Sequence, residues 1–145
     1  MSKKSGRIAQ LIESCRGQKL DPYYLGYFRC FNEGLFYESH DVLEELWLGC
    51  RKEPRGNFYK GLIQFAGAFV HLEKDRLKPA AALFRLSASY LHAYRPEHEH
   101  LDVDEVLRVA SDWIRYLEED QFAKNPLTGR PQPILRLSLE SNVSP

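Results

Sequence analysis

Apolar residues recur through residues 21–120 at intervals of three and four, the spacing that places side chains on one face of an α-helix. No stretch alternates apolar and polar positions in the way that a half-buried strand does. The pattern therefore predicts an all-α fold. We expect a compact bundle of about five helices, built on helix-turn-helix hairpins around a buried central helix.

Two helices are predicted in the first third of the chain. The first begins at Asp21 and Pro22, an N-cap followed by proline at the first helical position, and ends at Gly34. Glycine suits the left-handed conformation that closes many helices. In the sequence "FNEG" we expect Asn32 and Gly34 to form the turn that leads into a second helix over about residues 37–50.

Three further helices follow. The segment 58–74, "FYKGLIQFAGAFVHLEK", is apolar around most of its circumference and is predicted to be the central helix. A fourth helix is expected over about 79–94. The fifth opens at Asp102 and Glu105, which have the spacing of a capping box. Between the last two, the polar "HEH" at 98–100 is predicted to be a solvated turn.

The predicted helices and the prolines near the C-terminus suggest that the chain divides into three parts. Residues 1–20 are expected to be an N-terminal segment that is a short helix or partly disordered. Residues 21–121 form the helical bundle domain. Residues 122–145 contain several prolines and are predicted to form an extended tail.

Charge and composition narrow the class of protein. Apolar residues make up 43%, and 20 basic residues balance 20 acidic ones, with no basic stripe, so we expect no nucleic acid partner. No run approaches the roughly 18 apolar residues of a membrane span, and we expect no membrane partner. The three cysteines, Cys15, Cys30 and Cys50, are widely spaced and odd in number, which favours a reducing compartment and predicts a cytoplasmic location.

Candidate chemistry lies on the second helix. His40 and Trp47 share the stripe that should face the core, and Glu44 follows His40 by one helical turn. Of the acidic residues in this helix, we expect Glu44 to be the inward carboxylate and Asp41 to be solvated.

The central helix adds Gln64 and His71, two polar interruptions of an apolar surface. At i and i+7 they share a face but lie about 10.5 Å apart along the helix axis. A single metal ion bound to His40 and Glu44 would therefore recruit one of them as a further ligand, but not both.

An inward imidazole and carboxylate one turn apart permit three interpretations. They can hydrogen-bond within a satisfied buried network that includes Trp47 and Gln64 and fixes the packing of the helices. They can ligate a divalent metal such as zinc, which predicts a small metal-dependent hydrolase with His40 and Glu44 as ligands. They can also line a pocket for a small ligand or a peptide.

The sequence favours the first interpretation, a satisfied buried network. The protein would then be a non-enzymatic binding or interaction module. A homodimer or another protein is its candidate partner. The alternative is the metal-dependent hydrolase.

These motifs resemble a known family. His40, Glu44 and Trp47 form a His-x-x-x-Glu-x-x-Trp motif, which follows the Phe-Asn-x-Gly turn at 31–34. The Gly-Leu-Ile-Gln segment at 61–64 and the later His71 also fit, and together they are similar to the domain-of-unknown-function family numbered 309. The resemblance covers roughly residues 21–94. It implies a compact helical bundle, no established activity, and a motif cluster of His40, Glu44, Trp47, Gln64 and His71.

Overall fold

The computed structural model describes residues 6–138 and places nearly all of them in helices or short connections. The elements in chain order are α1 (Gly6–Ser14), α2 (Pro22–Asn32), α3 (Phe36–Cys50), α4 (Gly56–Glu73), α5 (Leu77–Leu91), the 3-10 turn η1 (His92–Tyr94), β1 (Glu97–His98), β2 (Leu101–Asp102), α6 (Val103–Glu119) and α7 (Pro126–Gly129).

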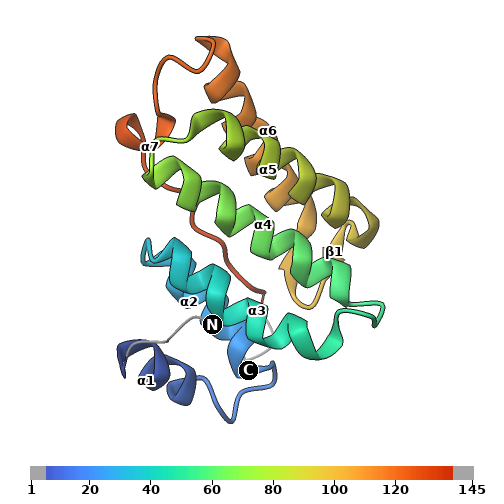
Figure 1. Cartoon of the computed structure of the whole chain (residues 1–145). Coiled ribbons are helices and arrows are strands. Elements are labelled where there is room, and N and C mark those ends of the chain that lie inside the picture. Colours follow the sequence, from blue (N-terminus) through green and yellow to red (C-terminus); the bar gives the residue numbers. More distant parts are fainter. Residues whose placement is uncertain (1–5, 139–145) are drawn as a thin grey trace.

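The helices form two hairpins that meet along α4. Helices α2 and α3 pair with one another, as do α4 and α5, and α3 also packs along α4 (Figure 1). Helix α6 covers α5 from the other side, and α1 lies against α2. The predicted all-α bundle around a buried central helix is confirmed, since most residues of α4 are buried.

Local capping sets where the helices begin and end. The carboxylate of Asp21 accepts a hydrogen bond from the backbone N–H of Tyr23 at 2.7 Å, and that of Asp102 accepts one from Glu105 at 3.0 Å. Gly34 has φ +80°, the left-handed conformation that glycine adopts without steric cost. The three predicted helix boundaries are therefore confirmed, and each has a local cause.

Aromatic side chains fill the space between the two hairpins. The ring centroid of Phe31 on α2 lies 5.5 Å from that of Phe65 and 5.3 Å from that of Phe69, both on α4. Such tilted and edge-to-face pairs add to the free energy gained from apolar burial. The hydroxyl of Tyr27 donates to the backbone carbonyl of Leu62 at 2.6 Å inside this core, and burial raises the pKa of that phenol. This bond ties the first hairpin directly to α4.

The connection at 98–100 differs from the predicted solvated turn. Strands β1 and β2 form a two-stranded antiparallel hairpin, and Glu99 and His100 at its tip have φ of +47° and +65°. The ring of His98 packs 4.5 Å from that of Phe58. The turn itself is present at residues 99–100, but residues 98–100 are only partly exposed, and polar residues in a sequence give no sign of the distant partners that cover them.

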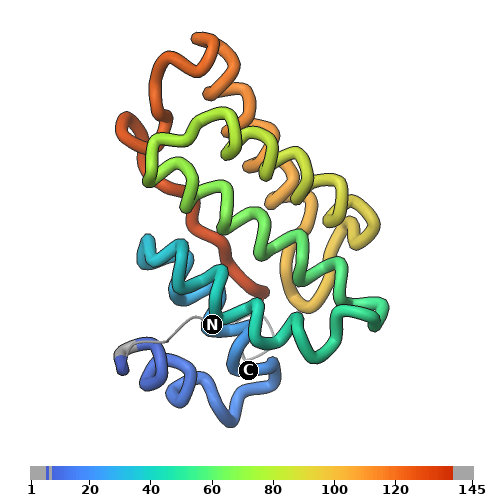
Figure 2. Tube along the Cα trace, in the orientation of Figure 1, coloured from blue at the N-terminus to red at the C-terminus, as the bar shows by residue number. Residues whose placement is uncertain are grey.

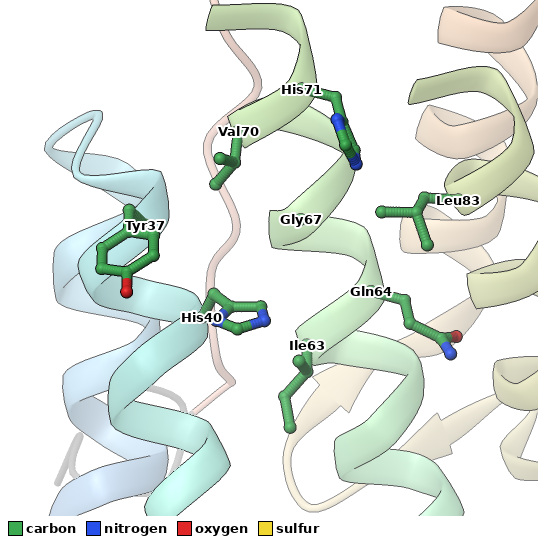
Figure 3. Close-up of a pocket in the computed structure, with 8 residues that line it drawn as sticks. All are labelled: Tyr37, His40, Ile63, Gln64, Gly67, Val70, His71 and Leu83. Carbon is green, nitrogen blue, oxygen red and sulfur yellow. The ribbon is translucent and has the colours of Figure 1, made fainter. Parts of the chain in front are cut away.

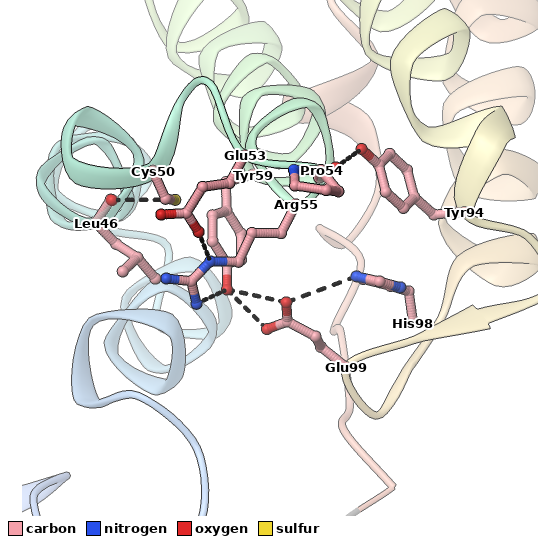
Figure 4. Close-up of polar contacts among 9 residues, drawn as sticks. All are labelled: Leu46, Cys50, Glu53, Pro54, Arg55, Tyr59, Tyr94, His98 and Glu99. Atoms are coloured by element: carbon pink, nitrogen blue, oxygen red, sulfur yellow. Dashed lines mark hydrogen bonds and ion pairs between the residues drawn. The ribbon is translucent and has the colours of Figure 1, made fainter.

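Two tyrosines fix the tip of this β-hairpin. The hydroxyl of Tyr24 donates to the backbone carbonyl of Glu99 at 2.9 Å, and that of Tyr59 reaches its carboxylate at 2.8 Å (Figure 4). Burial, followed by the contact with Glu99, raises the pKa of Tyr59. His98 lies 3.6 Å from the same carboxylate. The hairpin is thereby anchored to α2 and α4.

The C-terminal segment runs as an extended chain after α7, as expected. Figure 2 follows its red trace from α7 back toward α2. Leu135 is buried, and its backbone pairs twice with the side chain of Asn32: the Asn32 amide donates to the Leu135 carbonyl, and the Leu135 N–H donates to Asn32 Oδ1, both at 2.8 Å. Asn32 is the last residue of α2, and its side chain holds the tail. Residues 139–145 of the predicted tail lie outside the described part.

Some remaining expectations concern the N-terminus and the cysteines. Within the predicted N-terminal segment, α1 packs Ile8 and Ile12 against Val42 of α3, and residues 1–5 lie outside the described part. All three cysteines are buried, and none forms a disulfide bond within the described residues. Across residues 6–138, no helix has both the length and the apolar character needed to cross a bilayer.

The tail clamp gives a first prediction. Asn32→Leu removes both hydrogen bonds to Leu135, so we expect the free energy of unfolding to fall by about 1–3 kcal/mol. Amide hydrogen exchange at Leu135 should accelerate because its N–H loses its acceptor. Asn57→Leu is the matched control, since Asn57 is exposed on α4. Equal loss of stability in both variants, with Leu135 still protected, would contradict the clamp.

Candidate functional site

A groove of about 230 Å³ opens where α3, α4 and α5 meet (Figure 3). Helix α4 forms its floor, with α3 on one side and α5 on the other. We call it the α4 groove. Its lining residues are Tyr37, His40, Ile63, Gln64, Gly67, Val70, His71 and Leu83.

The floor owes its depth to a missing side chain. Gln64, Gly67 and His71 lie at i, i+3 and i+7 and so share one face of α4. A Cβ atom on Gly67 would lie 3.2 Å from Cδ1 of Leu83 and 3.9 Å from Cδ2 of His40. These two side chains therefore reach over Gly67 from opposite walls, as Figure 3 shows.

The polar atoms of the motif are buried without hydrogen-bond partners. Nδ1 of His40, Oε1 of Gln64 and Nδ1 of His71 are in this state within the described chain. Nε1 of Trp47, also on α3, is a fourth such atom. Buried polar groups are nearly always paired, and leaving one unpaired costs about 1–3 kcal/mol.

The satisfied network expected from the sequence is therefore not formed by these residues. The His40 ring points across Gly67, whereas the Gln64 carboxamide turns toward α5 (Figure 3). Tyr37 stacks on His40, with ring planes 18° apart. The two hydrogen-bonding groups therefore line the groove without meeting each other.

The acidic residues of α3 also lie differently from the expectation. Glu44 is only partly buried and does not line the α4 groove. Asp41, expected in solvent, retains 6% of its accessible surface. The next residue, Val42, packs with Ile8 and Ile12 of α1.

The polar line on α4 continues beyond the groove to Lys60, one turn before Gln64. The Nζ atom of Lys60 lies 5.7 Å from the ring of Trp47 on α3 and 5.3 Å from that of Tyr90 on α5. Placing a cation over aromatic faces is favourable. Sequence analysis missed Lys60 and Gly67. An isolated glycine inside an apolar helix was the available signal for the latter.

The protonation of His71 follows from its position. Burial lowers the pKa of this imidazole, and the positive charges of Arg76 and Lys74 lower it further. The neutral ring that results carries one donor and one acceptor nitrogen, so His71 can either give or take a hydrogen bond from a ligand.

The proposed metal ligands do not gather a larger set around them. Throughout residues 6–138, no group of three or more His, Cys, Asp and Glu side chains is placed to hold a metal ion. Ligation by His40 and Glu44 stays a prediction, with two protein ligands.

Comparison with known proteins gives one match. Residues 24–83 match the family DUF309, described as a domain of unknown function. No curated protein and no solved structure matches the chain. The matched segment ends at Leu83, so it contains every residue that lines the α4 groove, together with the motif residues Glu44 and Trp47.

The position of His71 predicts a measurable titration. Because its pKa in the folded state lies below the unfolded value of about 6.5, the unfolded chain takes up the proton first. The free energy of unfolding should therefore fall as pH drops through about 6.5 toward the folded pKa. Histidine ring NMR shifts measure that pKa directly, and Arg76→Met should move it back toward its ordinary value.

The control for the stability effect is His92→Gln, which alters an exposed histidine. His71→Gln should flatten this part of the pH profile, whereas His92→Gln should leave it. A His71 pKa at or above the ordinary value would contradict the lowering expected from burial and from the nearby positive charges.

Proposed function

We propose that this chain, which belongs to the DUF309 family through residues 24–83, is a non-enzymatic binding module whose ligand lies in the α4 groove. The family description names no activity. The proposal therefore rests on the chemistry of the groove.

The observation that best supports a binding function is that unpaired polar atoms gather at one site. Among the described residues, five buried side-chain nitrogen or oxygen atoms lack a hydrogen-bond partner, and four of them belong to the motif residues His40, Trp47, Gln64 and His71. Elsewhere, buried hydroxyls are paired: Ser39 donates to the Tyr27 carbonyl and Ser87 to the Gly61 carbonyl. A ligand that pairs with the groove atoms removes their desolvation cost, and this gain contributes to its affinity.

The lining indicates what such a ligand contains. Ile63, Val70 and Leu83 offer apolar contact, while the carboxamide and the two imidazoles offer a few converging hydrogen-bonding groups. That combination is typical of binding sites, where apolar walls supply affinity and few polar groups supply orientation. We propose a ligand with an apolar part and an amide or similar polar group.

The metal-dependent hydrolase is the second candidate. The unpartnered Nδ1 of His40 favours it, because a neutral imidazole nitrogen is a common zinc ligand. Glu44 weighs against it, since this carboxylate does not line the same groove. A catalytic zinc site usually has three protein ligands, and His40 with Glu44 provides two. The binding module is therefore the better supported function.

The binding function predicts saturable contact with a small probe. N-acetylleucine methylamide, which pairs an aliphatic side chain with two amides, should shift the methyl NMR signals of Ile63, Val70 and Leu83. Gly67→Ala should weaken this binding about tenfold or more, a loss of at least about 1.4 kcal/mol, because the added methyl occupies the groove floor.

The matched control is Gly49→Ala on α3, where an added Cβ meets nothing within 4 Å. Both alanines should preserve or raise stability, since alanine favours a helix over glycine by about 1 kcal/mol. Absence of methyl shifts, or equal shifts in the wild type and Gly67→Ala, would contradict the proposal.

A separate measurement tests the hydrolase. After exposure to Zn²⁺ and exhaustive dialysis, we expect the wild type and His40→Ala to retain equally little zinc by elemental analysis, because the site lacks a third ligand. Near-stoichiometric zinc in the wild type that is lost in His40→Ala would instead favour the hydrolase.

A further inference from the structure

We infer that the α4 groove takes an extended peptide segment of a partner protein, with an aliphatic side chain inserted over Gly67 and an acidic side chain beside Lys60. The inference rests on the proposed binding function and names the chemistry of its ligand. Three independent features lead to it: the size of the groove, the carboxamide of Gln64 in its lining, and the cation of Lys60 next to it.

The size of the groove suits one side chain better than a whole small molecule. Its volume of about 230 Å³ lies below the roughly 300–1,000 Å³ of pockets that enclose drug-sized ligands. The polar line from Lys60 to His71 extends about 16 Å along α4 at 1.5 Å per residue. An extended chain advances about 3.3 Å per residue, so about five residues of a peptide match that length.

The carboxamide of Gln64 suits an extended backbone. Within this same chain, the carboxamide of Asn32 holds extended residue Leu135 by giving one hydrogen bond and taking another. Gln64 carries the same group, and its buried Oε1 has no partner. An extended segment presents free N–H and C=O groups, whereas a helix uses those groups internally. The occupant is therefore extended and not helical.

The positive charge of Lys60, at one end of the polar line from Lys60 to His71, is complementary to an acidic side chain. Lys60 lies between the rings of Trp47 and Tyr90, and it forms no ion pair with the described residues. The unpartnered indole N–H of Trp47 is a second donor next to this cation. A carboxylate there gains charge-assisted hydrogen bonds.

A display library of random seven-residue peptides, fused so that no peptide has a free C-terminus, tests this inference on the full chain. Selection against immobilised wild type, after depletion on Gly67→Ala, should enrich peptides with an aliphatic residue and a nearby Asp or Glu. A synthetic enriched peptide is then measured by fluorescence anisotropy. Gln64→Leu and Gly67→Ala should each weaken its binding about tenfold or more, whereas Gly49→Ala should not.

A double-mutant cycle tests the contact between Lys60 and the acidic residue of the peptide. Lys60→Met should weaken the acidic peptide about tenfold but leave its Asp→Asn or Glu→Gln version almost unchanged. Melting temperatures of all variants verify that they are folded. Equal effects on both peptides would overturn the pairing of the acid with Lys60.

The remaining outcomes separate the two proposals. If no peptide is enriched, or if enriched peptides bind Gly67→Ala equally or bind as helices, the peptide inference is overturned. The binding function nevertheless stands if N-acetylleucine methylamide still shifts the groove methyls of the wild type. If that probe also fails, both proposals fall.

Discussion

The burial of α4 on nearly every side is the constraint on which the rest of the fold depends. An apolar surface that surrounds a helix needs partners on all sides, and here the α2–α3 hairpin, α5 and the phenylalanine core supply them. The Tyr27 hydroxyl locks the first hairpin to the α4 backbone. The one strip of α4 that carries Gln64, Gly67 and His71 is apolar in part and incompletely covered, and it becomes the α4 groove.

Apart from Asp120, the buried polar side chains discussed above fall into two sets. Those that hold elements together are paired, including Tyr59 with Glu99 and Asn32 with the tail. The polar atoms of His40, Trp47, Gln64 and His71, in and beside the groove, are buried and unpaired. A chain that pairs its other buried hydroxyls does not need unpaired groups for its packing, and their cost in stability is compensated when a ligand supplies the missing partners. This contrast is the physical reason to regard the motif as a binding element.

His40 and Glu44 have the spacing for a mutual hydrogen bond, and the groove explains why they do not form one. His40 and Glu44 are one turn apart on α3, yet Glu44 lies off the groove lining while His40 stacks on Tyr37 and points over Gly67. A Cβ atom at position 67 would lie 3.2 Å from Leu83 Cδ1, which would have to shift slightly, and 3.9 Å from His40 Cδ2, an ordinary contact. Lys60, Trp47 and Tyr90 extend that arrangement with three side chains from three helices.

The sequence by itself determined the all-α class, the central helix and the boundaries at Asp21, Gly34 and Asp102, and it named three residues that line the α4 groove, His40, Gln64 and His71. These features depend on interactions within a few residues, or on a periodic pattern that one helix displays by itself. Only the tertiary structure decided that Asn32 holds Leu135, 103 positions away, that Tyr59 meets Glu99, 40 positions away, and that the motif atoms face a groove instead of one another. The direction of a side chain between packed helices depends on what the neighbouring helix presents. Here the ring of His40 meets α4 at Gly67, which has no side chain.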